Sequence, residues 1–269
     1  MCQFCVQHGE GQRWYFDARN YSEDLLSDLR RRKVIRHMLG NVDELRKVPE
    51  QLPAYDRLPS FLQWFFRWQM RRKLRRDHFG QVLPLEDVER IFQMATSIVR
   101  IPCVCRKVTT GEEKRFCYGI SMGPAGGKFV EILQGGGGSF LLGPDCRGFE
   151  TLTREEALQA FRQHERQGLC HSVWTFLTPF IGGICNCDRA DCLALKSAIS
   201  HGLPAIEKGH GRASVNLQEC TGCRRCMEVC QFGAVFYSAG RKKAGIDASK
   251  CYGCGICRSV CEKNAIALS

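Results

Sequence analysis

The first third of the chain carries apolar residues at helical spacing. Over residues 21–48 they recur with the period of an amphipathic helix, and Ser22 is a suitable N-cap, so this segment is predicted to be helical. A Gly-Asn pair at 40–41 would interrupt it. An extended connection is predicted next, because three prolines follow: Pro49, Pro53 and Pro59. A further helix is predicted over 85–100, with acidic residues near its start.

The segment between these helices changes character along its length. Residues 61–70 read FLQWFFRWQM and residues 71–76 read RRKLRR, so an aromatic front is followed by a basic end. The favoured interpretation is a core helix whose solvated basic last turn complements the helix dipole. Two alternatives stay open: a helix that packs on a protein partner, with arginines reaching acidic side chains, and a helix that lies on a membrane surface.

The middle of the chain mixes strand and helix signals. Residues 128–133 predict a strand, and the four glycines after Gln134 predict a turn before a second strand at 139–142. These glycines lack the Gly-Lys-Ser/Thr of a phosphate loop and the spacing of a dinucleotide fold, so they do not indicate nucleotide binding. Residues 153–156 form a capping box, which predicts a helix over 154–167.

Two copies of one cysteine pattern, C-x-x-C-x-x-C-x-x-x-C, lie near the C-terminal end, with the spacing that holds iron–sulfur clusters. Three thiolates on a tight loop reach neighbouring corners of one cubane. The fourth follows a longer gap, at the start of a short helix that carries it toward the other cluster. We therefore expect cluster one to be held by Cys220, Cys223, Cys226 and Cys261. Cluster two would be held by Cys251, Cys254, Cys257 and Cys230.

These motifs carry a resemblance: residues 215–269 resemble a bacterial-type ferredoxin with two [4Fe–4S] clusters. The stretch 215–234 is echoed by 246–266. The family usually has proline after the fourth cysteine, where this chain has Gln231 and Glu262, but no ligand is lost. A zinc site or a disulfide framework fits poorly, because paired zinc sites usually use two C-x-x-C units. The resemblance implies low-potential, one-electron carriers.

A second group of cysteines lies in the middle of the chain. Two C-x-C pairs would supply four thiolates, enough for a third [4Fe–4S] cluster or a tetrahedral zinc: Cys103 and Cys105, and Cys185 and Cys187. Cys117 and Cys192 are alternative ligands. Arg106, beside one pair, is expected to raise the potential of a cluster there. A cluster, a zinc ion and no bound metal all stay open.

The central region also carries a resemblance. The stretches IPCVCR at 101–106, GLCH at 168–171 and GICNC at 183–187 are similar to an uncharacterised family of ferredoxin-containing redox proteins from anaerobes. That resemblance implies a central region paired with a two-cluster ferredoxin end. Many members are more cysteine-rich after the Cys-Asn-Cys step, where this chain has 188–190 (DRA), so the central ligand set stays open.

The chain begins with a third, smaller set of metal-ligating residue types. Cys2, Cys5 and His8 could belong to a metal site, or the two thiols could be free or face a partner.

Composition and charge bound the function. The 18 cysteines among 269 residues would suit a secreted disulfide-rich protein, but such chains are short and begin with a signal peptide, and no apolar leader or membrane-length run is found. A cytoplasmic location is expected. The formal net charge of +11 falls to about +7 once two oxidised clusters are counted, so nucleic-acid binding is not favoured. The basic excess concentrates in 30–33 and 67–76.

Together these features predict an α+β protein with a helical basic N-terminal region (1–100), a central cysteine-rich α+β domain (101–210) and a two-cluster ferredoxin domain (211–269). No hydrolase elbow, zinc-protease helix or Walker loop occurs, and no catalytic residue is assigned. We predict an iron–sulfur electron-transfer protein, a subunit or dedicated partner of a larger anaerobic oxidoreductase complex. The alternative is a stand-alone reductase whose reaction site lies in the central domain.

Overall fold

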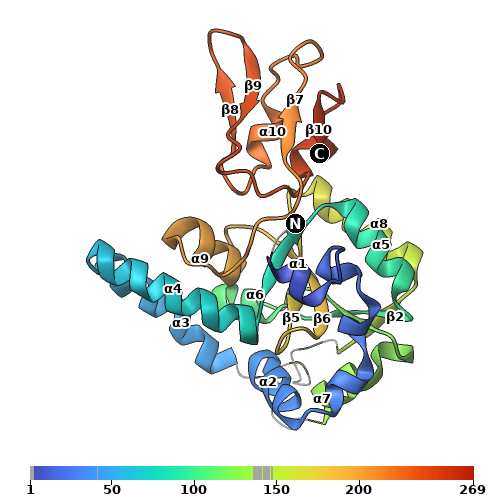
Figure 1. Ribbon diagram of the computed structural model, residues 1–269. Coiled ribbons are helices and arrows are strands. Elements are labelled where there is room, and N and C mark those ends of the chain that lie inside the picture. Colours follow the sequence, from blue (N-terminus) through green and yellow to red (C-terminus); the bar gives the residue numbers. More distant parts are fainter. Residues whose placement is uncertain (1–2, 41, 136–140, 142–145, 147) are drawn as a thin grey trace.

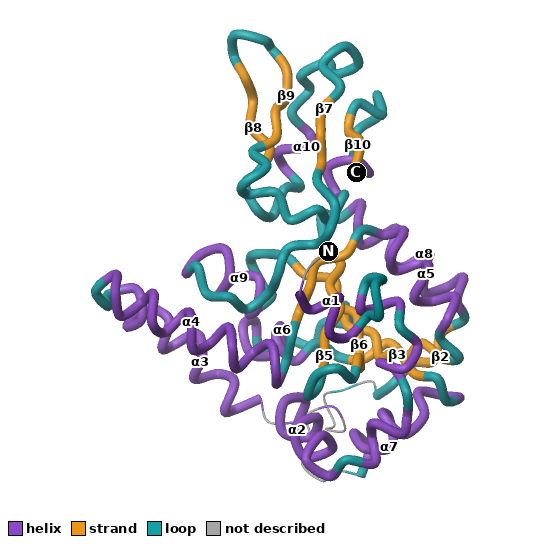
Figure 2. The backbone as a smooth tube through the Cα atoms, viewed as in Figure 1, coloured by secondary structure: helices purple, strands orange, loops and turns teal. Residues whose placement is uncertain are grey.

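The computed structural model describes the whole chain except residues 1–2, 41, 136–140, 142–145 and 147. The fold is α+β, as predicted. Its body is built on one antiparallel sheet of six strands, which Figure 2 shows running through the centre of the body. In spatial order the strands are β1 (Gly80–Leu83), β5 (Cys170–Thr175), β6 (Ile181–Cys187), β3 (Cys117–Ser121), β2 (Ser97–Ile101) and β4 (Glu150–Leu152).

One face of the sheet carries the largest apolar core. It is covered by α5 (Leu85–Met94), α8 (Arg154–Arg166) and the N-terminal segment with α1 (Gln3–His8), η1 (Trp14–Phe16) and η2 (Ala18–Tyr21). Alternate strand residues such as Tyr118, Val173 and Ile184 point into this core, as the period of two in a strand requires. Trp14 is fully buried there, and its indole N–H donates to Gln81 Oε1 at 2.6 Å.

The opposite face is covered by α2 (Leu29–Gly40), α6 (Val104–Thr110), α7 (Gly127–Gln134) and α9 (Leu193–His201), with η3 (Glu23–Ser27) and η4 (Pro124–Gly126) beside them. The strand residues that alternate with those of the first core point toward these helices. They include Val99, Trp174 and Cys187. Cys170 of β5 and the two cysteines of β6, Cys185 and Cys187, therefore share this face.

A helical hairpin projects from the body in Figure 1, made of α3 (Val42–Asp56) and α4 (Ser60–Asp77). The predicted extended connection is wrong, because Pro49 and Pro53 lie inside α3. Each proline removes one helical hydrogen bond. Leu52 and Tyr55 of the same helix pack against Leu203, which ties the helix to the body.

The prediction of α4 as a core helix is also wrong. All of its residues are described and none is buried. The aromatic side chains of Phe61 and Trp64 are 69% and 66% exposed. Phe61, Trp64, Phe65 and Trp68 are spaced i, i+3, i+4 and i+7, so they form one stripe along the helix, and this stripe is exposed rather than packed on the body.

Two other segments differ from the sequence predictions. Residues 128–133 form helix α7 rather than a strand, because a short apolar run does not distinguish a strand from a buried helix. Its start is set by Gly126 and Gly127, both with positive φ. The predicted helix 85–100 ends at Met94, and residues 97–101 pair with β3 and β4 instead. The strand predicted at 139–142 lies outside the described residues apart from Leu141.

The remaining helix predictions fare better. Helix α8 begins at the predicted capping box, in which Thr153 and Glu156 each bond the other's backbone N–H. The helix predicted over 21–48 is broken into η3, α2 and the start of α3, with Ser22 as the N-cap of η3. Residues 80–100, which we assigned to the helical N-terminal region, supply two strands of the sheet.

The C-terminal module sits on one end of the body, at the top of Figure 1. It contains two two-stranded antiparallel sheets, β7 (Ala213–Val215) with β10 (Ile266–Leu268) and β8 (Val235–Ser238) with β9 (Lys243–Ile246). Two single-turn helices, α10 (Arg225–Glu228) and α11 (Ile256–Ser259), stand at equivalent places in the two halves. Each contains the third cysteine of its run and ends before the fourth, so the predicted helix start at the fourth cysteine is wrong.

Candidate functional site

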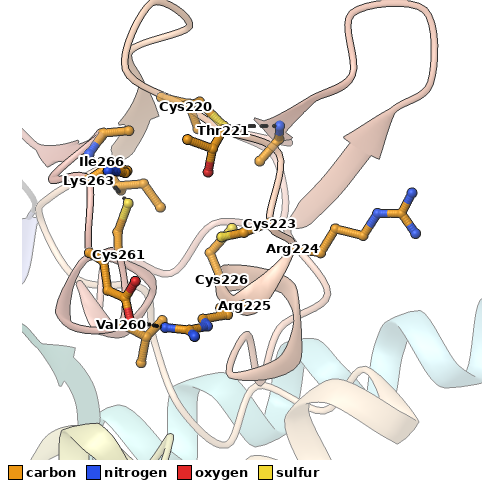
Figure 3. Close-up of a pocket in the computed structure, with 14 residues that line it drawn as sticks. Cys220, Thr221, Cys223, Arg224, Arg225, Cys226, Val260, Cys261, Lys263 and Ile266 are labelled. Carbon is orange, nitrogen blue, oxygen red and sulfur yellow. Dashed lines mark hydrogen bonds and ion pairs between the residues drawn. The ribbon is translucent and has the colours of Figure 1, made fainter.

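The first cavity of the C-terminal module is lined by four cysteines from both halves of the sequence repeat. It has a volume of about 120 Å³. Figure 3 shows Cys220, Cys223 and Cys226 on one side and Cys261 on another, arranged around the opening. Cys220 and Cys226 are buried, whereas Cys223 is exposed. These are the four residues that the spacing rule assigns to cluster one.

The backbone of the first run bends sharply to bring its thiols together. Gly222 has φ +73°, and a Cβ there would come within 2.3 Å of the carbonyl oxygen of Lys242. Arg224 also adopts a left-handed conformation, with φ +68°. Backbone N–H groups are directed at the sulfurs: that of Ala244 lies 3.5 Å from Cys220 Sγ, and that of Ala265 lies 3.3 Å from Cys261 Sγ. Such donors stabilise negative charge on cluster thiolates.

The second cavity is smaller, and it is lined by Cys230, Cys251, Cys254 and Cys257. These are the four residues assigned to cluster two. Tyr252 and Phe232 form part of its wall, and their rings stack at 4.1 Å. Burial raises the pKa of Cys257 to about 12 and also raises that of Cys254. These two thiols are therefore protonated near neutral pH, and a cluster bound by them would displace their protons.

A third group of cysteines converges on the sheet face that carries α6 and α9. Cys185 and Cys187 are two residues apart on β6, so both point to this face. Cys117 on β3 is the register partner of Cys185. Cys103 and Cys192 precede the first residues of α6 and α9, and Cys105 lies in the first turn of α6.

The six sulfurs form two trios. In the first, Cys117 interacts with both Cys103 and Cys185, and its Sγ lies 3.2 Å from that of Cys185. The second is centred on Cys192, which interacts with Cys105 and lies 3.3 Å, sulfur to sulfur, from Cys187. The structure thus places all six central cysteines together, including the two that we named as alternatives.

The central group has its own electrostatic setting. Interactions with Cys105 and Cys187 lower the pKa of Cys192 well below the ordinary value. The interaction with Cys192, together with burial, raises the pKa of Cys105. The pKa values of neighbouring thiols in the second trio are therefore shifted in opposite directions by their shared contacts.

Arg106 crosses from α6 to the loop that follows β6. Its guanidinium pairs with Asp188, donates to Asn186 O at 3.0 Å and lies 3.9 Å from Cys103 Sγ. Its side chain is only 3% exposed. A permanently charged group is thus held beside the central cysteines, on the loop that connects Cys187 to Cys192.

Sequence reasoning missed one cysteine of this face. Cys170 on β5 is fully buried and is the register partner of Cys187. The alternation along β5 was the signal available, because it places Cys170 and His171 on opposite faces. His171 accordingly faces the other core, where its Nδ1 lies 2.6 Å from Asn186 Oδ1.

A large apolar cavity adjoins the central cysteines. Its volume is about 360 Å³, three times that of the first cluster cavity. The six central cysteines line one side. Apolar side chains from α3, α4 and β5, including Val48, Leu74 and Trp174, line the other.

Within the described residues, no three His, Cys, Asp or Glu side chains are arranged to hold a single metal ion. This holds for the two C-terminal cavities as well as for the central group.

The N-terminal residues do not form a comparable group in the part of the chain that the structure describes. Cys2 lies outside it. Cys5 is buried, with its Sγ 3.5 Å from His210 Nε2, and the His8 ring lies tilted against the Phe4 ring, with the ring centres 4.7 Å apart. The metal-site interpretation of this segment stays a prediction.

Comparison with known proteins bears on the C-terminal region. Residues 219–266 match the family described as 4Fe-4S dicluster domain. Neither a curated protein nor a solved structure matches the chain. The C-terminal region is thus a ferredoxin-type domain for two [4Fe–4S] clusters, and the chain is an iron–sulfur electron-transfer protein. No described helix is long and apolar enough to cross a membrane.

Proposed function

We propose that this protein is a subunit or dedicated partner of a larger oxidoreductase complex and relays single electrons through three sites in the order cluster one, cluster two, central cysteines. The observation that carries this proposal is a shared apolar cluster between cluster two and the central group. It contains Cys170, Cys187 and Cys192 from the body, and Cys230 and Cys254 from the second cavity pack against it.

The shared cluster sets the order of the relay. Phe232, from the wall of the second cavity, packs in it together with Trp174, from the wall of the central cavity. Cluster two is therefore the inner of the two ferredoxin clusters. Cluster one lies at the outer end, where Cys223 is exposed. Electron tunnelling falls steeply with distance, so a partner exchanges electrons most easily at that outer end.

The central site in this proposal is a third [4Fe–4S] cluster held by Cys103, Cys105, Cys185 and Cys187. These four are the outer members of the two trios, with Cys117 and Cys192 between them. Outer members stand farther apart than neighbours, as the corners of a cubane require. When bound, the cluster would supply one-electron chemistry. Arg106 would stabilise its reduced form through positive charge near Cys103.

A second docking surface in this proposal, at the central end of the relay, is the exposed front of α4, because Met70 and Leu74 of this helix line the cavity beside the central cysteines. Large apolar side chains are rarely left exposed in such numbers on one element without a binding role. Here they are Phe61, Leu62, Trp64, Phe65, Phe66 and Trp68. The run 30–33 contributes less than its charge suggests, because Arg31 is buried and donates to the carbonyl oxygens of Phe176 and Leu177.

Metal analysis tests the relay. Protein purified without oxygen should contain about twelve iron atoms and as much acid-labile sulfide, whereas two clusters give about eight. The double variant Cys105→Ser/Cys187→Ser should lose about four iron atoms and keep both ferredoxin-type electron paramagnetic resonance signals. Cys254→Ser should delete one of those signals. Cys146→Ser is the matched control, because Cys146 lines none of the three cavities.

Several results would overturn parts of the proposal. Eight iron atoms with one zinc would replace the central cluster with zinc. Eight iron atoms and no other metal would remove the central site from the relay. An unchanged spectrum in Cys254→Ser would refute the ligand assignment for cluster two.

A second candidate function, catalysis in the central domain, is favoured by one observation. The cavity beside the central cysteines is three times as large as the first cluster cavity and is mostly apolar. It therefore has room for an apolar substrate next to a cluster. If the chemically reduced protein converts such a substrate without any partner, the carrier function is insufficient and this candidate replaces it.

A further inference from the structure

A cleft of about 820 Å³ lies between α4 and the segment 202–212, which joins α9 to the ferredoxin-type domain. Figure 1 shows α4 and α9 beside one another below that domain. The volume falls within the range of small-molecule and cofactor sites. None of the proposed cluster ligands lines the cleft, so it is separate from the three cysteine groups.

The cleft is positively charged. Its cationic side chains come from both walls: Arg67 and Arg71 of α4, and Lys208 and Arg212 of the joining segment. Only one carboxylate, that of Glu207, lies among the lining residues, and Arg71 pairs with it at 3.3 Å. The Arg71 side chain is still 55% exposed. An excess of guanidinium and ammonium groups in a concave site favours a phosphorylated ligand.

The cleft also offers flat aromatic surfaces. Trp64 and Trp68 line the α4 side and are 66% and 46% exposed, and Tyr252 lines the opposite side. Exposed indoles at the edge of a concave site stack readily on planar rings. The combination of arginines and indoles therefore selects a ligand with a phosphate at one end and an aromatic ring system at the other.

Tyr252 connects this cleft to cluster two. It stands between Cys251 and Cys254 in the sequence and lines both the cleft and the second cluster cavity. Its ring stacks on Phe232 at 4.1 Å, and the ammonium of Lys208 lies 5.4 Å from the ring centre. A ring bound in the cleft is thus separated from the cluster-two ligands by a single side chain.

We propose that the cleft binds a phosphorylated aromatic redox cofactor of the flavin class, which exchanges electrons with cluster two. This inference rests on the proposed relay. The phosphate lies against Arg71 and the ring stacks on Trp68. Reduction of one oxidised flavin takes two electrons, delivered singly as reduced clusters return to their oxidised state, and two protons from solvent.

Anaerobic fluorescence titration tests the cleft, with FMN and riboflavin as probes because they differ only in the phosphate. FMN should bind more tightly than riboflavin. Arg71→Gln should weaken FMN about tenfold, the size of one charge-assisted hydrogen bond, and leave riboflavin unchanged. Trp68→Ala should weaken both about fivefold or more, since both lose the stacking contact. Arg76→Gln removes the same charge from the same helix outside the cleft and should bind like the parent.

The outcomes separate this inference from the relay. Iron, sulfide and the resonance spectrum are measured on the same samples, so the presence of clusters is established independently. Clusters with no FMN binding, equal binding of FMN and riboflavin, or equal losses in Arg71→Gln and Arg76→Gln would overturn the cofactor site alone. Release of bound FMN by millimolar inorganic phosphate, but not by chloride at matched ionic strength, supports recognition of the phosphate.

Discussion

Replacing Arg106 with methionine should destabilise the central region more than any exposed charge change in the chain. The guanidinium is almost fully buried, pairs with Asp188, donates to Asn186 O at 3.0 Å and stacks over the ring of Phe116 at 4.3 Å. Methionine keeps much of the side-chain volume but none of the donors. Asp188 and the carbonyl of Asn186 would then lose their partner.

The expected cost follows from this burial. Removing one partner of a buried ion pair costs about 3–5 kcal/mol, because the other charge is left without compensation. Asp188 is 17% exposed and also accepts from the backbone N–H of Asp191 at 2.6 Å, so the lower end applies. A loss of about 3 kcal/mol corresponds to a fall of about 6–12 °C in the midpoint for a chain of this size.

Thermal unfolding followed by circular dichroism at a fixed scan rate, without oxygen, measures this effect. Arg106→Met and Asp188→Asn should each lower the midpoint. The stability lost in the double variant should be about 2 kcal/mol less than the two single losses added together, because the second change removes a charge already left unpaired. Lys114→Gln breaks the more exposed pair with Asp191 and should cost less than about 1 kcal/mol. The reasoning would be refuted if Arg106→Met lost no more stability than Lys114→Gln. It would also be refuted if the double variant lost the full sum of the two single losses.

Three further predictions concern other parts of the fold. Thr153→Ala removes the N-cap of α8 and should cost about 1 kcal/mol, seen as a midpoint lower by about 2–4 °C; an unchanged midpoint would contradict it. Burial lowers the pKa of His164 to about 4, below its value of 6.5 in the unfolded chain, so the unfolded state binds the extra proton as the pH falls. His164 should therefore contribute a drop of about 1 kcal/mol between pH 7 and 5.5, and His78, whose pKa burial also lowers to about 4, should contribute a similar one, so His164→Gln should reduce the drop by about 1 kcal/mol in urea titrations. Gly80→Ala would place a Cβ 2.3 Å from the Trp174 ring and should cost about 1–3 kcal/mol with a change in tryptophan fluorescence, whereas Gly240→Ala, with open space around it, should do neither.

Local signals predicted the elements that local chemistry controls. The capping box at Thr153 starts α8 where expected, since its hydrogen bonds close within one turn. The run at 128–133 predicts a strand because apolar residues occupy both its odd-numbered and its even-numbered positions. Burial of Phe129, Ile132 and Leu133 against the helices and loops of one sheet face makes it a helix. Propensity and pattern cannot anticipate which surface a short apolar segment will meet.

The exposed front of α4 shows the same limit. Its composition resembles a core helix, and only the position of the hairpin outside the body leaves Trp64 and Trp68 accessible. Cys170 was not singled out as a site residue for a related reason. A lone cysteine in sequence has no spacing partner, and its role depends on the strand register with Cys187.

The sequence by itself determined the two cysteine runs of the ferredoxin-type domain, because ligand spacing on a tight loop is a property of a few consecutive residues. Tertiary structure alone decided the grouping of the central cysteines. The central cysteines come from three separated stretches, and only strand register and the starts of α6 and α9 bring their sulfurs together. The same packing places Cys170 between that group and Cys254. Contacts between distant segments depend on how whole faces bury their apolar area, which no local pattern encodes.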